Sequence, residues 1–206
     1  MFIFDAHLPL IIKNGNHVQQ LPSIKCIGKR LSPPAAGWYL MPARVYVTVI
    51  GSSAATQWEA EAAYRVGLLL ARAGAVVVTG GRGGVMEAAS RGAKEAGGLT
   101  LGILPGASRG EANPYVDVAV PTGLGHARNA VNVLAGDAVI AVGGGPGTLS
   151  EIGLALAYGR PVVALRGPGA AGLLAGRSIG GRLVYAADTP EEAVERALEL
   201  AGARVR

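Results

Sequence analysis

The sequence predicts an α/β domain of the Rossmann-like, doubly wound kind, in which a mainly parallel sheet carries helices on both faces. Three observations support this prediction. From residue 44 onward, short β-branched runs alternate with longer helical stretches, as they do in βαβ units. Two glycine-rich turns each lead from a strand into a helix. Hydrophobic residues make up 50% of the chain and charged residues 16%, which is typical of buried strands joined by tight turns.

The strands are predicted from runs rich in valine, isoleucine and leucine that are bounded by glycine, proline or polar residues. In chain order they are Val45–Ile50, Ala75–Thr79, Leu99–Leu104, Val116–Val120, Ala138–Val142, Pro161–Leu165 and Leu183–Tyr185. Because crossovers between parallel strands are right-handed, the intervening helices should cover both faces of the sheet.

The helices predicted between these strands are Trp58–Ala73, Gly84–Ala96, His126–Leu134, Thr148–Tyr158 and Pro190–Ala201. The last one has Asp188 or Thr189 as its cap and a proline in its first turn. The helix Thr148–Tyr158 is apolar nearly all round, so we expect it to be buried, in part within a subunit interface. A homodimer or a higher homo-oligomer is therefore expected.

The composition changes near Met41. The first 40 residues hold three of the four lysines and two of the three histidines, and they end after a Pro33-Pro34 break. We interpret residues 1–40 as a poorly structured extension, or as sequence translated upstream of a true start at Met41. Residues 41–206 form the predicted nucleotide-binding domain.

The formal net charge of +5 suits an anionic small molecule as well as nucleic acid. Nucleic acid is disfavoured because the chain has no basic run, recognition-helix pattern or aromatic stacking series. No apolar stretch reaches the roughly 20 residues of a membrane-spanning helix. The single cysteine, Cys26, excludes an intramolecular disulfide, and no cysteine/histidine spacing indicates a metal site, so a cytoplasmic setting is expected.

The two glycine turns predict a phosphate site at the carboxyl edge of the sheet. One reads Gly80-Gly81-Arg82-Gly83-Gly84-Val85-Met86 and the other Gly143-Gly144-Gly145-Pro146-Gly147-Thr148-Leu149-Ser150-Glu151. Such turns bring backbone N–H groups and a helix N-terminus close to an anion, although glycines also serve simply to make tight turns. The expected phosphate- or nucleotide-binding residues are Gly51, Ser52, Gly80, Gly81, Gly83, Gly84, Met86, Asn129, Gly144, Gly145, Gly147 and Thr148.

The turns match neither the G-x-G-x-x-G dinucleotide fingerprint nor a P-loop, so a mononucleotide or similar phosphate ester is predicted rather than NAD or ATP. Glu151 is either a catalytic carboxylate or the partner of Thr148 in a capping box. Arg128 either holds a phosphate or is an exposed surface arginine. His126 is more typical of a helix start than of a catalyst.

At these residues the chain resembles the LOG family, whose members are often labelled lysine decarboxylases. The family motif P-G-G-x-G-T-x-x-E is similar to residues 143–151, with Gly143 where proline is usual. The resemblance implies a Rossmann-like fold, a dimer or larger oligomer, and hydrolysis of a nucleoside 5′-monophosphate to base and ribose 5-phosphate without a cofactor. It also implies that Arg128 and Glu151 are the catalytic residues.

Two departures point to a second hypothesis. The usual arginine-lysine pair reads Arg128-Asn129, and the segments 113–115 and 122–125 look more like a subgroup that includes molybdenum-cofactor carrier proteins. A carrier would keep the phosphate-binding turns without chemistry, because the molybdenum cofactor is a pterin bearing a phosphate. A decarboxylase that uses pyridoxal phosphate is not expected, since the domain's only lysine, Lys94, lies away from both turns.

Overall fold

The computed structural model describes residues 11–14, 17–20 and 44–205. The chain divides into two units at Met41 and Pro42. In the first unit, strands β1 (Ile11–Asn14) and β2 (His17–Gln20) pair in antiparallel register. The sequence predicted no strand there. The rest of the expected extension lies outside the described residues.

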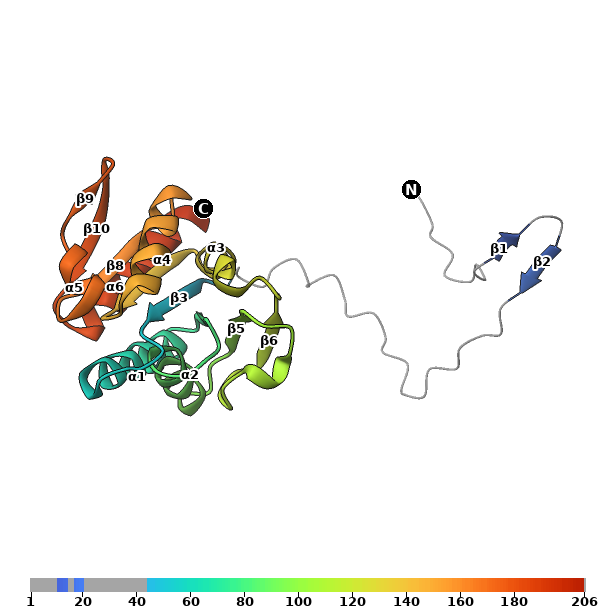
Figure 1. Ribbon diagram of the computed structural model, residues 1–206, viewed down its shortest axis with the longest axis horizontal. Helices are drawn as coiled ribbons and strands as arrows, with labels where there is room; N and C mark the ends of the chain where they lie inside the picture. Colours follow the sequence, from blue (N-terminus) through green and yellow to red (C-terminus); the bar gives the residue numbers. More distant parts are fainter. Residues whose placement is uncertain (1–10, 15–16, 21–43, 206) are drawn as a thin grey trace. The chain divides into compact units, whose positions relative to one another are not determined.

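The second unit is built on an eight-stranded sheet with the order β6-β5-β4-β3-β7-β8-β10-β9 (Figure 1). Neighbouring strands are parallel except for β9, which is antiparallel to β10. The strand bounds are β3 Tyr46–Gly51, β4 Val76–Thr79, β5 Thr100–Leu104, β6 Val118–Pro121, β7 Ala138–Val142, β8 Val162–Leu165, β9 Ser178–Ile179 and β10 Arg182–Ala187. The predicted doubly wound, mainly parallel sheet is confirmed.

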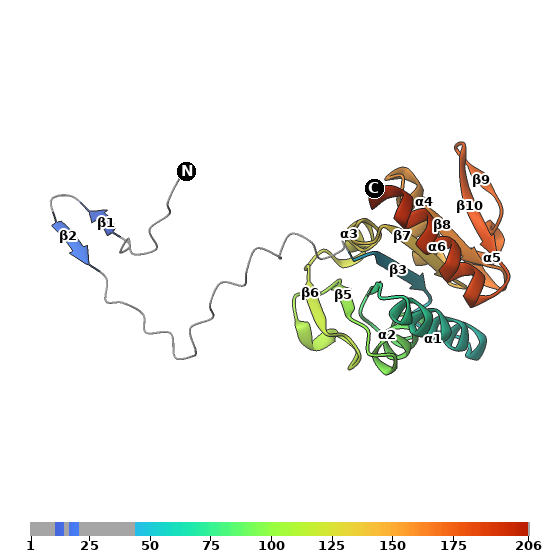
Figure 2. The same cartoon turned by 180° about the vertical axis from the view of Figure 1, so that it is seen from behind.

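Six α-helices in the described residues cover the two faces of this sheet (Figures 1 and 2). They are α1 Gln57–Arg72, α2 Val85–Glu95, α3 Arg128–Ala135, α4 Pro146–Ala157, α5 Gly169–Leu174 and α6 Pro190–Val205. Apolar residues of α1, α2 and α6 pack on one face, and those of α3, α4 and α5 pack on the other. The side chains of β7 alternate between the two faces of the sheet. Ile140 packs in the hydrophobic core on the side of α1, α2 and α6, and Val139 packs in the core on the side of α3, α4 and α5.

In the second unit, one helix and one strand were not predicted. Helix α5 has only six residues and two glycines, and β9 has only two residues, so neither carries a periodic pattern. The helix expected from His126 begins instead as a short 3₁₀ turn, η3 (Gly125–Ala127), and becomes α-helical at Arg128. A second 3₁₀ turn, η2 (Arg109–Glu111), precedes β6.

The predicted burial of α4 is only partly correct. Ile152, Ala155 and Leu156 are buried, whereas Leu149 is 51% exposed and Tyr158 is 46% exposed in the single chain. Within the described residues, no helix is both long enough and apolar enough to cross a membrane.

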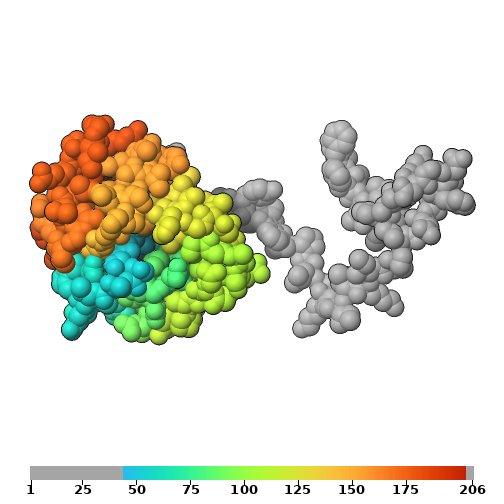
Figure 3. Space-filling view, in the orientation of Figure 1, coloured from blue at the N-terminus to red at the C-terminus, as the bar shows by residue number. Residues whose placement is uncertain are grey.

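The sheet order places a crevice between β3 and β7. The chain runs from β3 through β4 and β5 to β6 on one side, then returns to place β7 on the other side of β3. Ligands of open parallel sheets bind where the connections diverge in this way, at the carboxyl ends of the strands. Segments following β3, β4, β5 and β7 meet on one face of the domain (Figure 3).

Candidate functional site

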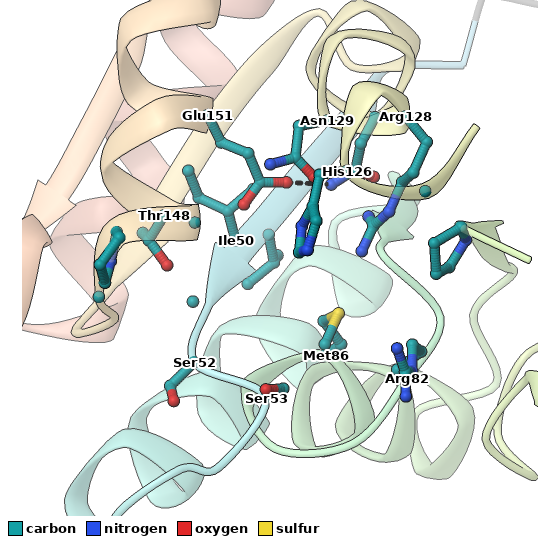
Figure 4. Close-up of a pocket in the computed structure, with 18 residues that line it drawn as sticks. Ile50, Ser52, Ser53, Arg82, Met86, His126, Arg128, Asn129, Thr148 and Glu151 are labelled. Atoms are coloured by element: carbon teal, nitrogen blue, oxygen red, sulfur yellow. Dashed lines mark hydrogen bonds between the residues drawn. The ribbon is translucent and has the colours of Figure 1, made fainter.

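A cavity of about 490 Å³ lies at this crevice. Its volume is in the range of sites for small organic ligands. The lining residues come from the end of β3, the turn after β4 with the start of α2, the end of β5, the η3–α3 segment and the start of α4 (Figure 4). They are Val49, Ile50, Gly51, Ser52, Ser53, Arg82, Met86, Pro105, Gly125, His126, Arg128, Asn129, Asn132, Gly145, Pro146, Gly147, Thr148 and Glu151.

Arg128, the first residue of α3, is buried beside this cavity and is only 9% exposed. Its Nε and Nη1 atoms have no hydrogen-bond partner anywhere in the described residues. Burial lowers the pKa of Arg128, the nearby Glu151 carboxylate opposes this, and Arg82 lowers it further. The interpretation of Arg128 as an exposed surface arginine is therefore wrong. A buried guanidinium with free N–H groups is suited to bind an anion.

Glu151 faces the same cavity from α4 and is 7% exposed. Its Oε1 accepts a hydrogen bond of 2.8 Å from Nδ2 of Asn132. Burial raises the pKa of Glu151, while the Asn132 bond and the charge of Arg128 act in the opposite direction. A carboxylate with a raised pKa in a cleft is typical of a functional group.

The capping-box alternative for Thr148 and Glu151 is wrong. Helix α4 begins at Pro146 with Gly145 as its N-cap, and no side chain caps it. Thr148 therefore lies inside the first helical turn, where its hydroxyl is on the cavity side (Figure 4). The carboxylate of Glu151 instead accepts the hydrogen bond from Nδ2 of Asn132.

The N-terminus of α4 offers unpaired N–H groups to the cavity. Leu149 is the first residue to donate within the helix, to the carbonyl oxygen of Gly145. The N–H groups of Gly147 and Thr148 precede it and have no acceptor inside the helix. Free N–H groups and the helix dipole favour an anion at such a position. The phosphate contact expected there from the sequence stays a prediction.

Gly144, which we expected to bind phosphate, does not offer its N–H to a ligand. That N–H donates to Oε1 of Glu59 at 2.8 Å, and the residue is not part of the cavity lining. Its φ of +84° is suited to glycine, and a Cβ at this position would overlap Thr148. Gly144 therefore shapes the turn rather than contacting the ligand.

The glycines of the other turn also have packing roles. Gly80, Gly81, Gly83 and Gly84 do not line the cavity, so their predicted contact with phosphate is not supported. A Cβ at Gly80 would overlap the guanidinium of Arg128, and one at Gly84 would overlap the Ser52 carbonyl oxygen. The N–H of Gly81 donates to Oγ1 of Thr79. The close packing at Gly80 and Gly84 is what the tight-turn interpretation expects, and the phosphate contact of this turn stays a prediction.

The remaining predicted residues do line the cavity: Gly51, Ser52, Met86, Asn129, Gly145, Gly147 and Thr148. Asn129 also donates from Nδ2 to Oγ of Ser150 at 3.0 Å, which joins α3 to α4. Gly51 is required by packing as well, because a Cβ there would overlap the carbonyl oxygen of Val142.

The sequence interpretation missed four polar lining residues: Ser53, Arg82, His126 and Asn132. Asn132 follows Arg128 by four positions, so both lie on the same face of α3, and this spacing could have indicated it. Arg82 lies within the glycine turn at residues 80–84, and the sequence interpretation considered only the glycines of that turn as ligand contacts. His126 was treated as a helix-start residue, whereas its ring borders the cavity (Figure 4).

The described residues contain no group of three or more histidine, cysteine, aspartate or glutamate side chains arranged to hold a metal ion. Lys94 forms an ion pair with Asp117 and does not line the cavity. The site therefore offers no lysine for a Schiff base.

Comparison with known proteins agrees with this geometry. The model of the SLOG cluster4 family matches residues 44–194. The molybdenum cofactor binding protein of Rippkaea orientalis is 40% identical, with a TM-score of 0.68 over 76% of this chain and 97% of that one. The molybdenum cofactor carrier protein of Chlamydomonas reinhardtii is 32% identical, with a TM-score of 0.63 over 77% and 99%.

An uncharacterized protein of Archaeoglobus fulgidus is 44% identical over 72% of this chain and 91% of its own length. The family model spans most of the second unit. The chain therefore belongs to the SLOG cluster4 family.

Proposed function

We propose that this protein binds and carries a phosphorylated small-molecule cofactor, with the molybdenum cofactor as the candidate ligand. The observation that carries the proposal is Arg128, a buried guanidinium without a partner in the described residues, in a cavity that also receives the N-terminus of α4. The two relatives described above as molybdenum cofactor binding and carrier proteins support this choice of ligand.

The residues present fit such a ligand. A terminal phosphate would be held by the N–H groups of Gly147 and Thr148 at the α4 N-terminus. The side chains of Ile50 and Met86 give the cavity an apolar floor between its polar walls, which suits a planar ring system (Figure 4). The cofactor would be cargo, so the protein's tasks are to bind it, orient it and shield it from water.

A second candidate is hydrolysis of the N-ribosidic bond of a nucleoside 5′-monophosphate. It is favoured by Glu151, a buried carboxylate with a raised pKa in the same cavity as Arg128. In this reaction the oxygen of water bonds to C1′ while the bond from C1′ to the base nitrogen breaks, and the base leaves with that electron pair and takes up a proton. A carboxylate beside the sugar would stabilise the positive charge that develops on it.

The first experiment identifies the ligand. Protein purified from its native source is denatured, and the released small molecules are analysed by mass spectrometry and by the fluorescence of oxidised pterins. A stoichiometric pterin phosphate is the expected result. Native protein that releases only nucleotides, and that binds no pterin phosphate when this is added, would contradict the carrier proposal.

The second experiment separates carriage from hydrolysis. Wild type and Glu151→Gln are assayed for base release from AMP, GMP, CMP and UMP, and for phosphate-ester binding. A carrier shows no turnover in either protein, and its affinity changes less than about threefold in the variant, because the glutamine amide oxygen can still accept from Asn132. Base release by wild type that disappears in the variant would establish the hydrolase instead.

We also propose that the protein is a homo-oligomer, as the sequence interpretation expected. This is supported by exposed apolar side chains at Leu149 on α4, at Tyr158 directly after α4, and at Val131 and Leu134 on α3. Such side chains are commonly covered by a second subunit. Sedimentation velocity on the purified protein tests it, and a monomer at micromolar concentration would refute it.

A further inference from the structure

Two arginine side chains line the same end of the cavity (Figure 4). Arg82 lies in the turn that follows β4, and Arg128 begins α3. The charge of Arg82 disfavours the charged form of Arg128 and lowers its pKa, so the two groups are close enough to repel each other. The ion pairs of the described residues include neither of them. Arg82 is exposed, so water solvates its charge, whereas the buried guanidinium of Arg128 has two N–H groups without a partner in the described residues. An anionic ligand would satisfy these groups.

The protein itself supplies little negative charge at this end of the cavity. Glu151 is the only acidic residue among the lining residues described above, and it interacts with Arg128 through space without forming an ion pair. Its carboxylate is engaged by Asn132, and burial raises its pKa, which disfavours its charged form. The two guanidinium groups therefore form a positive pole, which we call the arginine pole.

The helix N-terminus of α4 forms a second positive position at a different place. The guanidinium of Arg128 lies against Gly80, at the carboxyl end of β4, whereas α4 follows β7. Strand β3 lies between β4 and β7 in the sheet. Neighbouring strands are about 4.8 Å apart, so the two positions are separated by about 10 Å. Figure 4 shows Thr148 and Arg82 at opposite sides of the cavity, with Ile50 and Met86 between them.

We propose that this cavity recognises small molecules with anionic groups at both ends, about 10 Å apart: a phosphate at the α4 N-terminus and a second anion at the arginine pole. The inference rests on the proposed function, because it takes phosphate binding at α4 as given, and it adds the class of ligand. A nucleoside monophosphate has an uncharged base opposite its phosphate and uses one of the two positions.

The test uses two probes that differ by a single phosphate, hexane-1,6-diyl bisphosphate and hexyl phosphate. Their dissociation constants are measured by isothermal titration calorimetry on the full chain at fixed ionic strength. We expect the bisphosphate to bind at least about tenfold more tightly, because its second phosphate can form charge-assisted contacts with the buried Arg128 and with Arg82. Arg82→Met should reduce this advantage to less than about threefold.

Arg177→Met is the matched control, because it removes one positive charge from an exposed residue outside the cavity. It should keep the full advantage of the bisphosphate, which separates the arginine pole from the general attraction of a basic protein for anions. An advantage that survives in both Arg82→Met and Arg128→Met would overturn the assignment of the second position.

The remaining outcomes separate this inference from the proposed function. Equal binding of the two probes to wild type would overturn the two-ended ligand while leaving phosphate binding at α4 intact. Failure of both probes to bind, together with no binding of inorganic phosphate, would remove the phosphate position itself. Both the inference and the proposed function would then be wrong.

Discussion

The N–H of Gly144 donates a hydrogen bond of 2.8 Å to Oε1 of Glu59, a residue 85 positions earlier in the chain. The other carboxylate oxygen accepts from the N–H of Thr56 at 2.8 Å and completes a capping box at the start of α1. One buried side chain thus joins the N-terminus of α1 to the turn that precedes α4. A carboxylate of the protein itself occupies the helix start where dinucleotide-binding folds hold a pyrophosphate.

The first prediction is that Glu59→Ala destabilises the domain by about 2 kcal/mol or more, because it removes a helix cap and leaves the buried N–H of Gly144 without an acceptor. Urea unfolding followed by circular dichroism measures the change. Glu61→Ala is the control, since Glu61 is an exposed residue of the same helix. Equal unfolding free energies for the two variants would show that the hydrogen bonds of Glu59 contribute nothing to the stability of the domain.

This effect should depend on pH. Burial alone would raise the pKa of Glu59, but the hydrogen bonds from Thr56 and Gly144 hold it below its ordinary value of 4.5. A carboxylate whose pKa is lower in the folded state contributes stability above its unfolded pKa and loses that contribution as the pH falls through the folded pKa. The difference between wild type and Glu59→Ala should therefore be full at neutral pH and shrink below pH 4.5. A difference that grows in acid would contradict this assignment.

A second prediction concerns Gly143, which stands where the LOG motif has proline. Its φ is +56°, and a Cβ there would overlap the carboxylate of Glu59. Proline fixes φ near −65°, so Gly143→Pro should destabilise the domain by about 3 kcal/mol or more despite restoring the family motif. Thermal unfolding measures this. The control is Gly145→Ala, whose added Cβ meets no atom within 4 Å. A variant as stable as wild type would show that the turn readily adopts the proline form.

The sequence predicted the sheet, seven of its eight strands and the longer helices because each of these elements has a strong local pattern, such as the valine run of β4. It also identified Arg128, Glu151 and Thr148, because glycine turns place helix starts at the carboxyl edge of the sheet. The roles of the individual glycines could not be predicted in this way. Whether a glycine contacts a ligand or makes room for another part of the protein depends on residues that are distant in the sequence. The N–H of Gly144, for example, is bonded to the carboxylate of Glu59.

A third prediction is that Glu151→Gln makes the protein more stable at neutral pH. Burial raises the pKa of Glu151 above 4.5, so the folded state binds this proton more tightly than the unfolded chain does. Stability then falls as the pH rises from the unfolded pKa through the folded one. Glutamine keeps the acceptor for Asn132 without the charge. Urea unfolding at neutral pH should show a gain of about 1 kcal/mol, and the gain should vanish below the unfolded pKa.

The exposed Glu195 provides the control for that prediction, since Glu195→Gln removes the same charge from the surface. It should change stability by less than about 0.5 kcal/mol at either pH. If Glu151→Gln instead destabilised the protein at neutral pH, the charged carboxylate would be a structural partner of Arg128. The interpretation that the charge of Glu151 lowers the stability of the fold and serves function would then be wrong.

The last prediction separates two glycines of one turn that the sequence treated alike. A Cβ at Gly80 would overlap both the guanidinium of Arg128 and the sulfur of Met86, whereas one at Gly83 would make only ordinary contacts, the nearest at 3.5 Å to the Ser53 carbonyl oxygen. Gly80→Ala should therefore displace the guanidinium and weaken binding of hexane-1,6-diyl bisphosphate by about tenfold, while Gly83→Ala leaves it within about twofold. Calorimetry on both variants measures the affinities, and circular dichroism verifies that each is folded. The physical reason is that the guanidinium of Arg128 occupies space that any side chain at residue 80 would fill, so only glycine leaves the cation in place to bind an anion. Similar losses in the two variants would mean that the whole turn contacts the ligand, as the glycine pattern alone suggested.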